Sequence, residues 1–165
     1  MVESLSTRIS VSGFSDVDGL DRLYRQQAAQ MWRALTAYSG SRDVAEDAVA
    51  EAFAQAIGRG DAIRSPEGWV WRAAYRIAAG ELKRRGSLTE FPVDVPASDD
   101  EPAWEIRAAL AKLSPMQRSA VVLHYYAGYR ASEIAEITGS TPAAVWVHLS
   151  RGRHNMARVL GATND

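Results

Sequence analysis

Apolar residues recur every three or four positions along most of the 165-residue chain, which predicts amphipathic helices, and no stretch alternates as a strand would. The first apolar stripe runs from Leu20 to Tyr38 and ends at Gly40. A second helix is expected to begin after the capping residue Ser41 and to break at Gly58. We expect the buried face of this second helix to comprise Ala45, Ala48, Val49, Ala52, Phe53, Ala56 and Ile57.

A third amphipathic run starts at Ser65-Pro66 and extends to about Arg85. Its predicted core arc holds Val70, Trp71, Ala74, Tyr75, Ile77, Ala78 and Leu82. The opposite side gathers Trp69, Arg72, Arg76 and Lys83. An exposed indole among three cations can hold unstacked bases beside a charged backbone. A solvated basic face with Trp69 packed on a neighbouring helix explains the same pattern equally well.

Residues 87–102 lose the helical period and are rich in proline and acidic residues, which predicts a linker. Helical patterns resume at 104–113, and Ser114-Pro115-Met116-Gln117 has the form of a capping box. The expected fold class is therefore all-α. We predict an N-terminal extension (1–13), a helical domain (14–86), an acidic flexible linker (87–102) and a second helical domain (103–165).

The end of the chain predicts a helix-turn-helix. A short apolar run around Ile134 and Ala135 stops at Gly139, and Thr141-Pro142 starts a longer helix with Val145 and Leu149 at helical spacing. Glycine suits the left-handed turn, and alanine allows two helices to cross closely. The second helix would then enter a DNA major groove. An ordinary helical hairpin is the alternative interpretation.

Net charge changes the picture only when it is divided along the chain. Residues 106–165 hold seven basic and three acidic residues, whereas residues 87–105 hold six acidic and no basic ones. The C-terminal part is thus modestly basic, which predicts weak DNA binding on its own. The second helix leaves acidic and amide groups on its polar face, which is either solvated or docks on a basic partner.

Several functional classes are disfavoured by the composition. The chain has no cysteine and only three scattered histidines, so we expect no disulfide, no metal site and no cofactor. No phosphate loop or hydrolase motif is present, which argues against an enzyme. No apolar run reaches the roughly 20 residues that span a bilayer. We therefore expect a cytoplasmic protein without membrane insertion.

Taken in order, these motifs resemble bacterial RNA polymerase sigma factors of the extracytoplasmic-function (ECF) group. The resemblance rests on three segments of the first domain, Val44–Ile57, Trp69–Ala78 and Lys83–Arg85. In the second domain it rests on Leu113–Leu123, on Gly128, Glu133–Glu136 and Gly139, and on Val145–Arg153. It covers nearly everything from about residue 14 to 160, and it implies sigma regions two and four.

The resemblance also implies roles for individual residues. The −35 element would be contacted by Arg118, Arg130, Thr141, Ala144, Trp146, Val147, His148 and Arg151. The −10 element and the opened strand would be contacted by Arg59, Arg64, Trp69, Arg72, Arg76 and Lys83. Core RNA polymerase would be bound by Glu46, Asp47, Glu51 and Gln55. The implied partners are the β′ clamp helices and the β flap of the polymerase, promoter DNA and an anti-sigma factor.

The expected function is therefore promoter recognition and strand opening in transcription initiation. Two alternatives stay open. One is a stand-alone helix-turn-helix regulator, which would bind duplex DNA tightly as a homodimer. The other is a sigma-like protein–protein adaptor, which the adjacent apolar residues Trp146 and Val147 suggest.

Overall fold

The computed structural model describes residues 12–86 and 101–163, and within these ranges every regular element is helical. This confirms the predicted all-α class. The helices are α1 (Ser12–Ser39), α2 (Arg42–Arg59), the 3-10 turn η1 (Gly60–Ala62), α3 (Pro66–Arg85), α4 (Glu101–Ala111), α5 (Pro115–Tyr125), α6 (Ala131–Thr138) and α7 (Pro142–Thr163). Most of the predicted linker lies outside the described residues, but its last two positions belong to α4.

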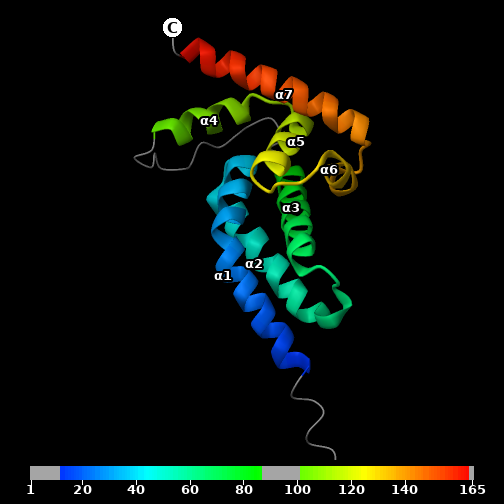
Figure 1. The fold of residues 1–165 in the computed structure, drawn as a ribbon. Coiled ribbons are helices and arrows are strands. Elements are labelled where there is room, and N and C mark those ends of the chain that lie inside the picture. The colour runs from blue at the N-terminus through cyan, green and yellow to red at the C-terminus, as the bar shows by residue number, and fades with distance from the viewer. Residues whose placement is uncertain (1–11, 87–100, 164–165) are drawn as a thin grey trace, which may run out of the picture.

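The N-terminal body consists of α1, α2 and α3, which pack on one another (Figure 1). Gly40 turns the chain with φ at 71°, a value that glycine adopts without strain. The side chain of Ser41 then accepts a hydrogen bond from the Val44 amide, so the predicted N-cap is confirmed. The predicted burial of Ile57 is wrong, because this side chain near the end of α2 is 55% exposed.

The C-terminal body consists of α4 to α7, with α7 lying across the top of the molecule in Figure 1. Ser114 and Gln117 form the predicted capping box at the start of α5, through exchanged backbone and side-chain hydrogen bonds. The centre of this body holds fully buried Leu110, Leu123 and Leu149. Burial of such side chains is the main term that holds short helices together.

The two bodies pack against each other rather than standing apart. Helix α1 contacts α4 and α5, and the buried apolar side chains of both bodies belong to one continuous cluster. The sequence pattern contains no sign of this contact. It positions the helix-turn-helix beside α3, the helix whose basic face is predicted to bind the opened DNA strand.

Candidate nucleic-acid interface

The turn between α6 and α7 has the geometry of a helix-turn-helix. Gly139 ends α6 in the left-handed conformation with φ at 69°, and the Ser140 amide donates to the Ala135 carbonyl at 2.9 Å. The Thr141 hydroxyl accepts a hydrogen bond from the Ala144 amide at 3.2 Å and so caps α7. The roles predicted for Gly139 and Thr141 in the backbone are confirmed.

Helix α7 is seated on α5 through a glycine that the sequence analysis did not single out. Gly152 is buried, and a side-chain Cβ at this position would lie 2.8 Å from Cγ2 of Val121 and 3.5 Å from the Gln117 carbonyl oxygen. On the same side of α7, Val145 and Leu149 are fully buried. This close seat fixes which face of α7 points outward.

The outward face of α7 carries most of the predicted −35 residues. Trp146 is 54% exposed, Val147 is 45% exposed and Arg151 is also exposed. Ala144 and His148 lie at the edge of this face and are half-buried. The structure thus brings the predicted α7 residues together on one surface, and their contacts with DNA stay predictions.

Two further side chains extend this surface. Tyr125, at the end of α5, is 54% exposed and accepts a hydrogen bond from the Arg153 guanidinium at 3.1 Å. Arg130, just before α6, is exposed, and its backbone amide donates to the Glu133 carboxylate at 2.9 Å. Because Arg130 needs only its backbone for this cap, its guanidinium stays available to a phosphate.

Arg118 differs from the other predicted −35 residues because it is buried between the two bodies, and its contact with DNA stays a prediction. Arg118 is 3% exposed, and its guanidinium donates to the Tyr38 carbonyl at 3.3 Å and lies over the Tyr38 ring at 5.8 Å. Burial lowers the pKa of Arg118 below its ordinary value. Arg118 can therefore contact a phosphate near the −35 element only after the C-terminal body has separated from α1.

Arg118 belongs to a polar interface between the two bodies. Beside it, the Tyr75 hydroxyl donates to Ser119 at 2.6 Å, and this pair is buried. Tyr38 packs against Tyr75 with ring centroids 5.1 Å apart. Burial raises the pKa of Tyr75 well above its ordinary value, so its hydroxyl stays protonated as a donor.

Two other hydrogen bonds cross the same boundary. The Tyr129 hydroxyl donates to the Gly68 carbonyl at 3.3 Å, and the Gln30 amide donates to the Tyr126 carbonyl at 2.6 Å. Burial raises the pKa of Tyr129 to about 12. Together with Arg118 and Tyr75, these contacts join the C-terminal body to both α1 and α3.

The basic face of α3 lies next to this interface. Arg76 is exposed and its guanidinium donates to the Glu136 carbonyl of α6 at 3.5 Å. Trp69 is half-buried with the Arg59 guanidinium over its ring at 5.4 Å. Arg72 is half-buried, while Lys83 is exposed. The predicted −10 residues therefore share one surface, and one of them already contacts the C-terminal body.

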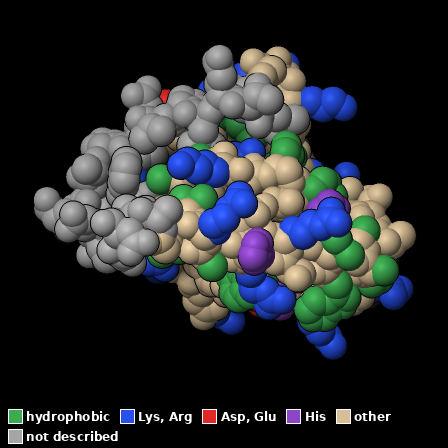
Figure 2. Space-filling model, turned by 90° about the horizontal axis from the view of Figure 1, so that it is seen from above, with side chains coloured by type: hydrophobic (Ala, Val, Ile, Leu, Met, Phe, Trp, Pro, Cys, Tyr) green, Lys and Arg blue, Asp and Glu red, His purple; other side chains and the backbone are tan. Residues whose placement is uncertain are grey.

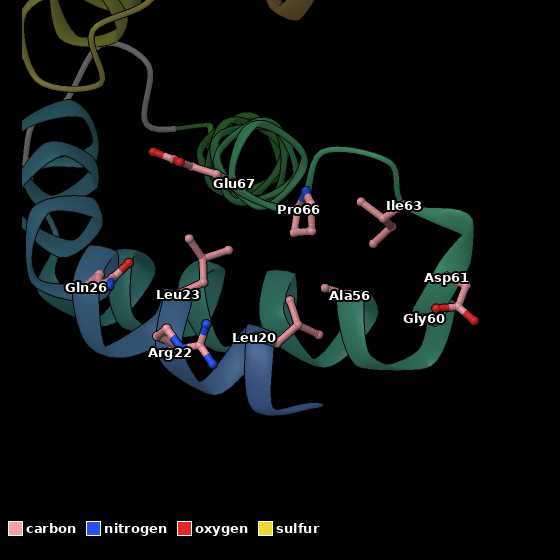
Figure 3. A pocket seen from close by; sticks show the side chains of 11 residues that line it. Leu20, Arg22, Leu23, Gln26, Ala56, Gly60, Asp61, Ile63, Pro66 and Glu67 are labelled. Atoms are coloured by element: carbon pink, nitrogen blue, oxygen red, sulfur yellow. The ribbon is translucent and has the colours of Figure 1, made fainter. Parts of the chain in front are cut away.

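The loop after α2 borders a pocket of about 380 Å³ between α1, the end of α2 and the start of α3 (Figure 3). Its walls include Leu20, Leu23 and Ile63, and Arg22 and Glu67 contribute charged groups to it. The exposed residues Arg59 and Arg64 belong to the same loop region. The predicted −10 loop therefore lies beside a hollow rather than on a flat surface.

The predicted polymerase-binding residues all lie on the solvent-facing side of α2. Glu46, Asp47, Glu51 and Gln55 are exposed. Three of them have partners within their own helix: Glu46 pairs with Arg42 at 3.0 Å, and Gln55 donates to Glu51 at 2.9 Å. Exposed pairs of this kind contribute little to stability, so this surface is free to exchange them for a partner.

Comparison with known proteins identifies the class of this fold. Residues 103–156 match the family Sigma-70, region 4. The chain is 31% identical over 153 residues to the ECF RNA polymerase sigma factor SigE of Mycolicibacterium smegmatis, covering 82% of this chain and 59% of SigE. It is 27% identical over 153 residues to the ECF RNA polymerase sigma factor SigM of Mycobacterium tuberculosis, covering 87% of this chain and 78% of SigM.

Two solved structures share the fold. The sigma factor RpoE from Bartonella quintana, in complex with the anti-sigma factor NepR, matches with a TM-score of 0.68 at 20% identity, covering 92% of this chain and 98% of RpoE. CnrH, in complex with the cytosolic domain of CnrY, matches with a TM-score of 0.68 at 18% identity, covering 92% of this chain and 93% of CnrH. At these identities the likeness shows the fold alone.

The predicted resemblance is thus confirmed: residues 103–156 match the family Sigma-70, region 4, and most of the chain is similar to mycobacterial ECF RNA polymerase sigma factors. The chain spans 59% of the length of SigE. Among the described residues, no helix is both long and apolar enough to cross a membrane.

Proposed function

We propose that this chain is an RNA polymerase sigma factor that directs promoter recognition and strand opening. The observation that carries the proposal is the seated α7 helix with its exposed outer face, within a domain that matches sigma-70 region 4. SigE and SigM are ECF RNA polymerase sigma factors, and each is similar to this chain along most of its length. The proposed domains are 14–86 and 103–165, joined by 87–102, and the proposed site of action is the cytoplasm.

In this function the two basic surfaces divide the promoter. The outer face of α7 contacts the −35 element, and the face of α3 with the loop after α2 contacts the −10 element and the opened strand. The exposed acidic side of α2 binds the β′ clamp helices of core polymerase, and the C-terminal body docks on the β flap. Tethering by the polymerase raises the effective concentration of each weakly basic surface at its DNA element.

The contact between the bodies sets a condition on this function. Arg76 donates to the Glu136 carbonyl, so α3 has to release the C-terminal body before Arg76 can contact DNA. Polymerase binding supplies the free energy for this separation. An anti-sigma factor is the proposed antagonist. The support is the fold shared with RpoE, which was solved with the anti-sigma factor NepR, and with CnrH, which was solved with the cytosolic domain of CnrY.

Run-off transcription with core polymerase tests the proposal. Adding the chain should produce transcripts from promoters recovered by co-purification of polymerase-bound DNA. Alanine substitution of Trp69 and Arg72 should abolish strand opening, measured by permanganate reactivity of unpaired thymines, while polymerase binding persists. A matched control is Arg25→Ala, which removes an exposed arginine of α1 that pairs only with Asp21 at 3.1 Å. Tight homodimeric duplex binding without polymerase would instead favour a stand-alone regulator.

A further inference from the structure

The first two turns of α7 lack the side chains that usually read bases. Residues 142–150 have the sequence PAAVWVHLS, without lysine, arginine, asparagine, glutamine or any acid. Arginine and lysine recognise guanine through two hydrogen bonds, and asparagine and glutamine recognise adenine in the same way. Base reading by this segment therefore relies on apolar contact, on the Ser150 hydroxyl and on the ring nitrogens of Trp146 and His148.

Val147 lies at the centre of the outward face of this segment. It is 45% exposed, and Ala143 and Ser150, one turn away on either side, are exposed and small. These small neighbours allow the helix backbone at Val147 to approach an opposing surface closely. A β-branched side chain in a helix strongly prefers one rotamer, so its two methyl groups are held in place before binding.

The charge around Val147 identifies the kind of surface that covers it. Helix α7 carries three arginines, at positions 151, 153 and 158, and no acidic residue. Arg151 and Arg153 are exposed. In the view from above, where α7 crosses the molecule, Lys, Arg and His side chains gather among apolar ones (Figure 2). An exposed apolar group on a helix that carries arginines and no acid suits the major groove of a duplex, where phosphates flank the bases.

We propose that Val147, with Ala143 beside it, recognises the C5-methyl group of thymine in the −35 element. The methyl group is the one apolar feature that a base pair presents in the major groove. The inference rests on the proposed function, because it assumes that α7 enters the −35 duplex. Trp146, exposed on the flank of the same face, covers the contact from one side.

Replacement of thymine by deoxyuridine tests the proposal, because it removes only this methyl group. The full chain, bound to core polymerase, selects −35 elements from a duplex library randomised at that position. Each thymine of the enriched element is then replaced by deoxyuridine on either strand. We expect about fourfold weaker promoter binding at one or two positions, since one buried methyl group is lost.

The variant Val147→Thr assigns the effect to this side chain. It keeps the β-branched shape and replaces one of the two methyl groups by a hydroxyl, so the difference in binding between thymine and deoxyuridine should become smaller. Ala157→Ser, at an exposed α7 position nearly three turns further on, is the matched control and should keep the full discrimination. Thermal unfolding of both variants establishes that the helix is intact.

Three results would overturn the proposal: an enriched element without thymine, equal binding of every deoxyuridine duplex, or unchanged discrimination by Val147→Thr. Failure of the proposed function has a different signature, which is the absence of any polymerase-dependent transcript from thymine-containing promoters. If the proposed function fails, the binding of thymine and deoxyuridine duplexes can still be compared with the full chain alone, and this comparison tests the role of Val147 separately.

Discussion

Two faces of the C-terminal body combine apolar and arginine side chains, and they have opposite fates. The face around Arg118 and Ser119 is buried against α1 and α3, and each of these two residues has a hydrogen bond to the N-terminal body. The face around Val147 and Arg151 is open to solvent. Buried polar groups with long-range partners indicate a contact within the protein. Exposed apolar groups beside exposed arginines indicate a contact with another molecule.

The largest expected effect is on the seat of α7, which holds the outer face in position. Gly152→Val should destabilise the C-terminal body by about 1–3 kcal/mol, because the new side chain overlaps Val121. Thermal unfolding of the full chain measures the change. Gly161→Ala is the control, since nothing lies within 4 Å of that Cβ, and it should be neutral or slightly stabilising. Equal stability of the two variants would contradict the close seat.

The interface between the bodies should respond less strongly. Ser119→Ala leaves the buried Tyr75 hydroxyl without its acceptor and should cost about 1–2 kcal/mol, while the double variant with Tyr75→Phe should recover part of that loss. A double-mutant cycle in urea measures the coupling between the two residues. Small-angle X-ray scattering should show a larger radius of gyration for Ser119→Ala. Strictly additive effects would mean that the hydrogen bond contributes nothing.

The tyrosine hydroxyls of this interface predict a pH dependence that the outer face of α7 does not share. The pKa of Tyr129 is about 12 in the folded protein against an ordinary value of 10. The folded state therefore keeps a proton that the unfolded state releases, so stability is full below pH 10 and falls as the pH rises from 10 towards 12. Tyr129→Phe should make the fall shallower in urea titrations at pH 8 to 12. An unchanged slope would place its hydroxyl in solvent.

The smallest effect on stability is expected on the exposed side of α2. Glu51→Gln removes a charge whose only described partner is Gln55 on the same helix, so the free energy of unfolding should change by less than about 0.5 kcal/mol. Its association with core polymerase should nevertheless slow down, and the rate should depend less on salt. Stopped-flow fluorescence measures this rate, with Asp21→Asn on α1 as the control. Equal rates would exclude this face from the polymerase contact.

Local features of the fold could be predicted from the sequence because they depend on neighbours within one or two turns. The caps at Ser41 and Ser114 and the turn at Gly139 are of this kind, and the structure confirms them. The outward face of α7 followed from the same helical period. These signals needed no knowledge of what the helices pack against.

Contacts between distant segments could not be predicted in this way. Tyr75 and Ser119 are 44 residues apart, and Arg118 and Tyr38 are 80 apart, so neither pair leaves a periodic signal. The resemblance implied a DNA contact for Arg118, and because arginine is rarely buried, nothing in the sequence pointed to its burial against Tyr38. Ile57 shows the reverse error, since an apolar residue at a helix end was assigned to the core and is exposed.

The chemistry of the interface between the bodies has a consequence for its variation. Four of its hydrogen bonds end on main-chain carbonyl oxygens, and the donors are Gln30, Arg76, Arg118 and Tyr129. A carbonyl oxygen survives any amino-acid exchange, so the accepting positions can drift without loosening the association. In these four hydrogen bonds, only the donor side chains offer natural selection a means of tuning how readily the two halves separate.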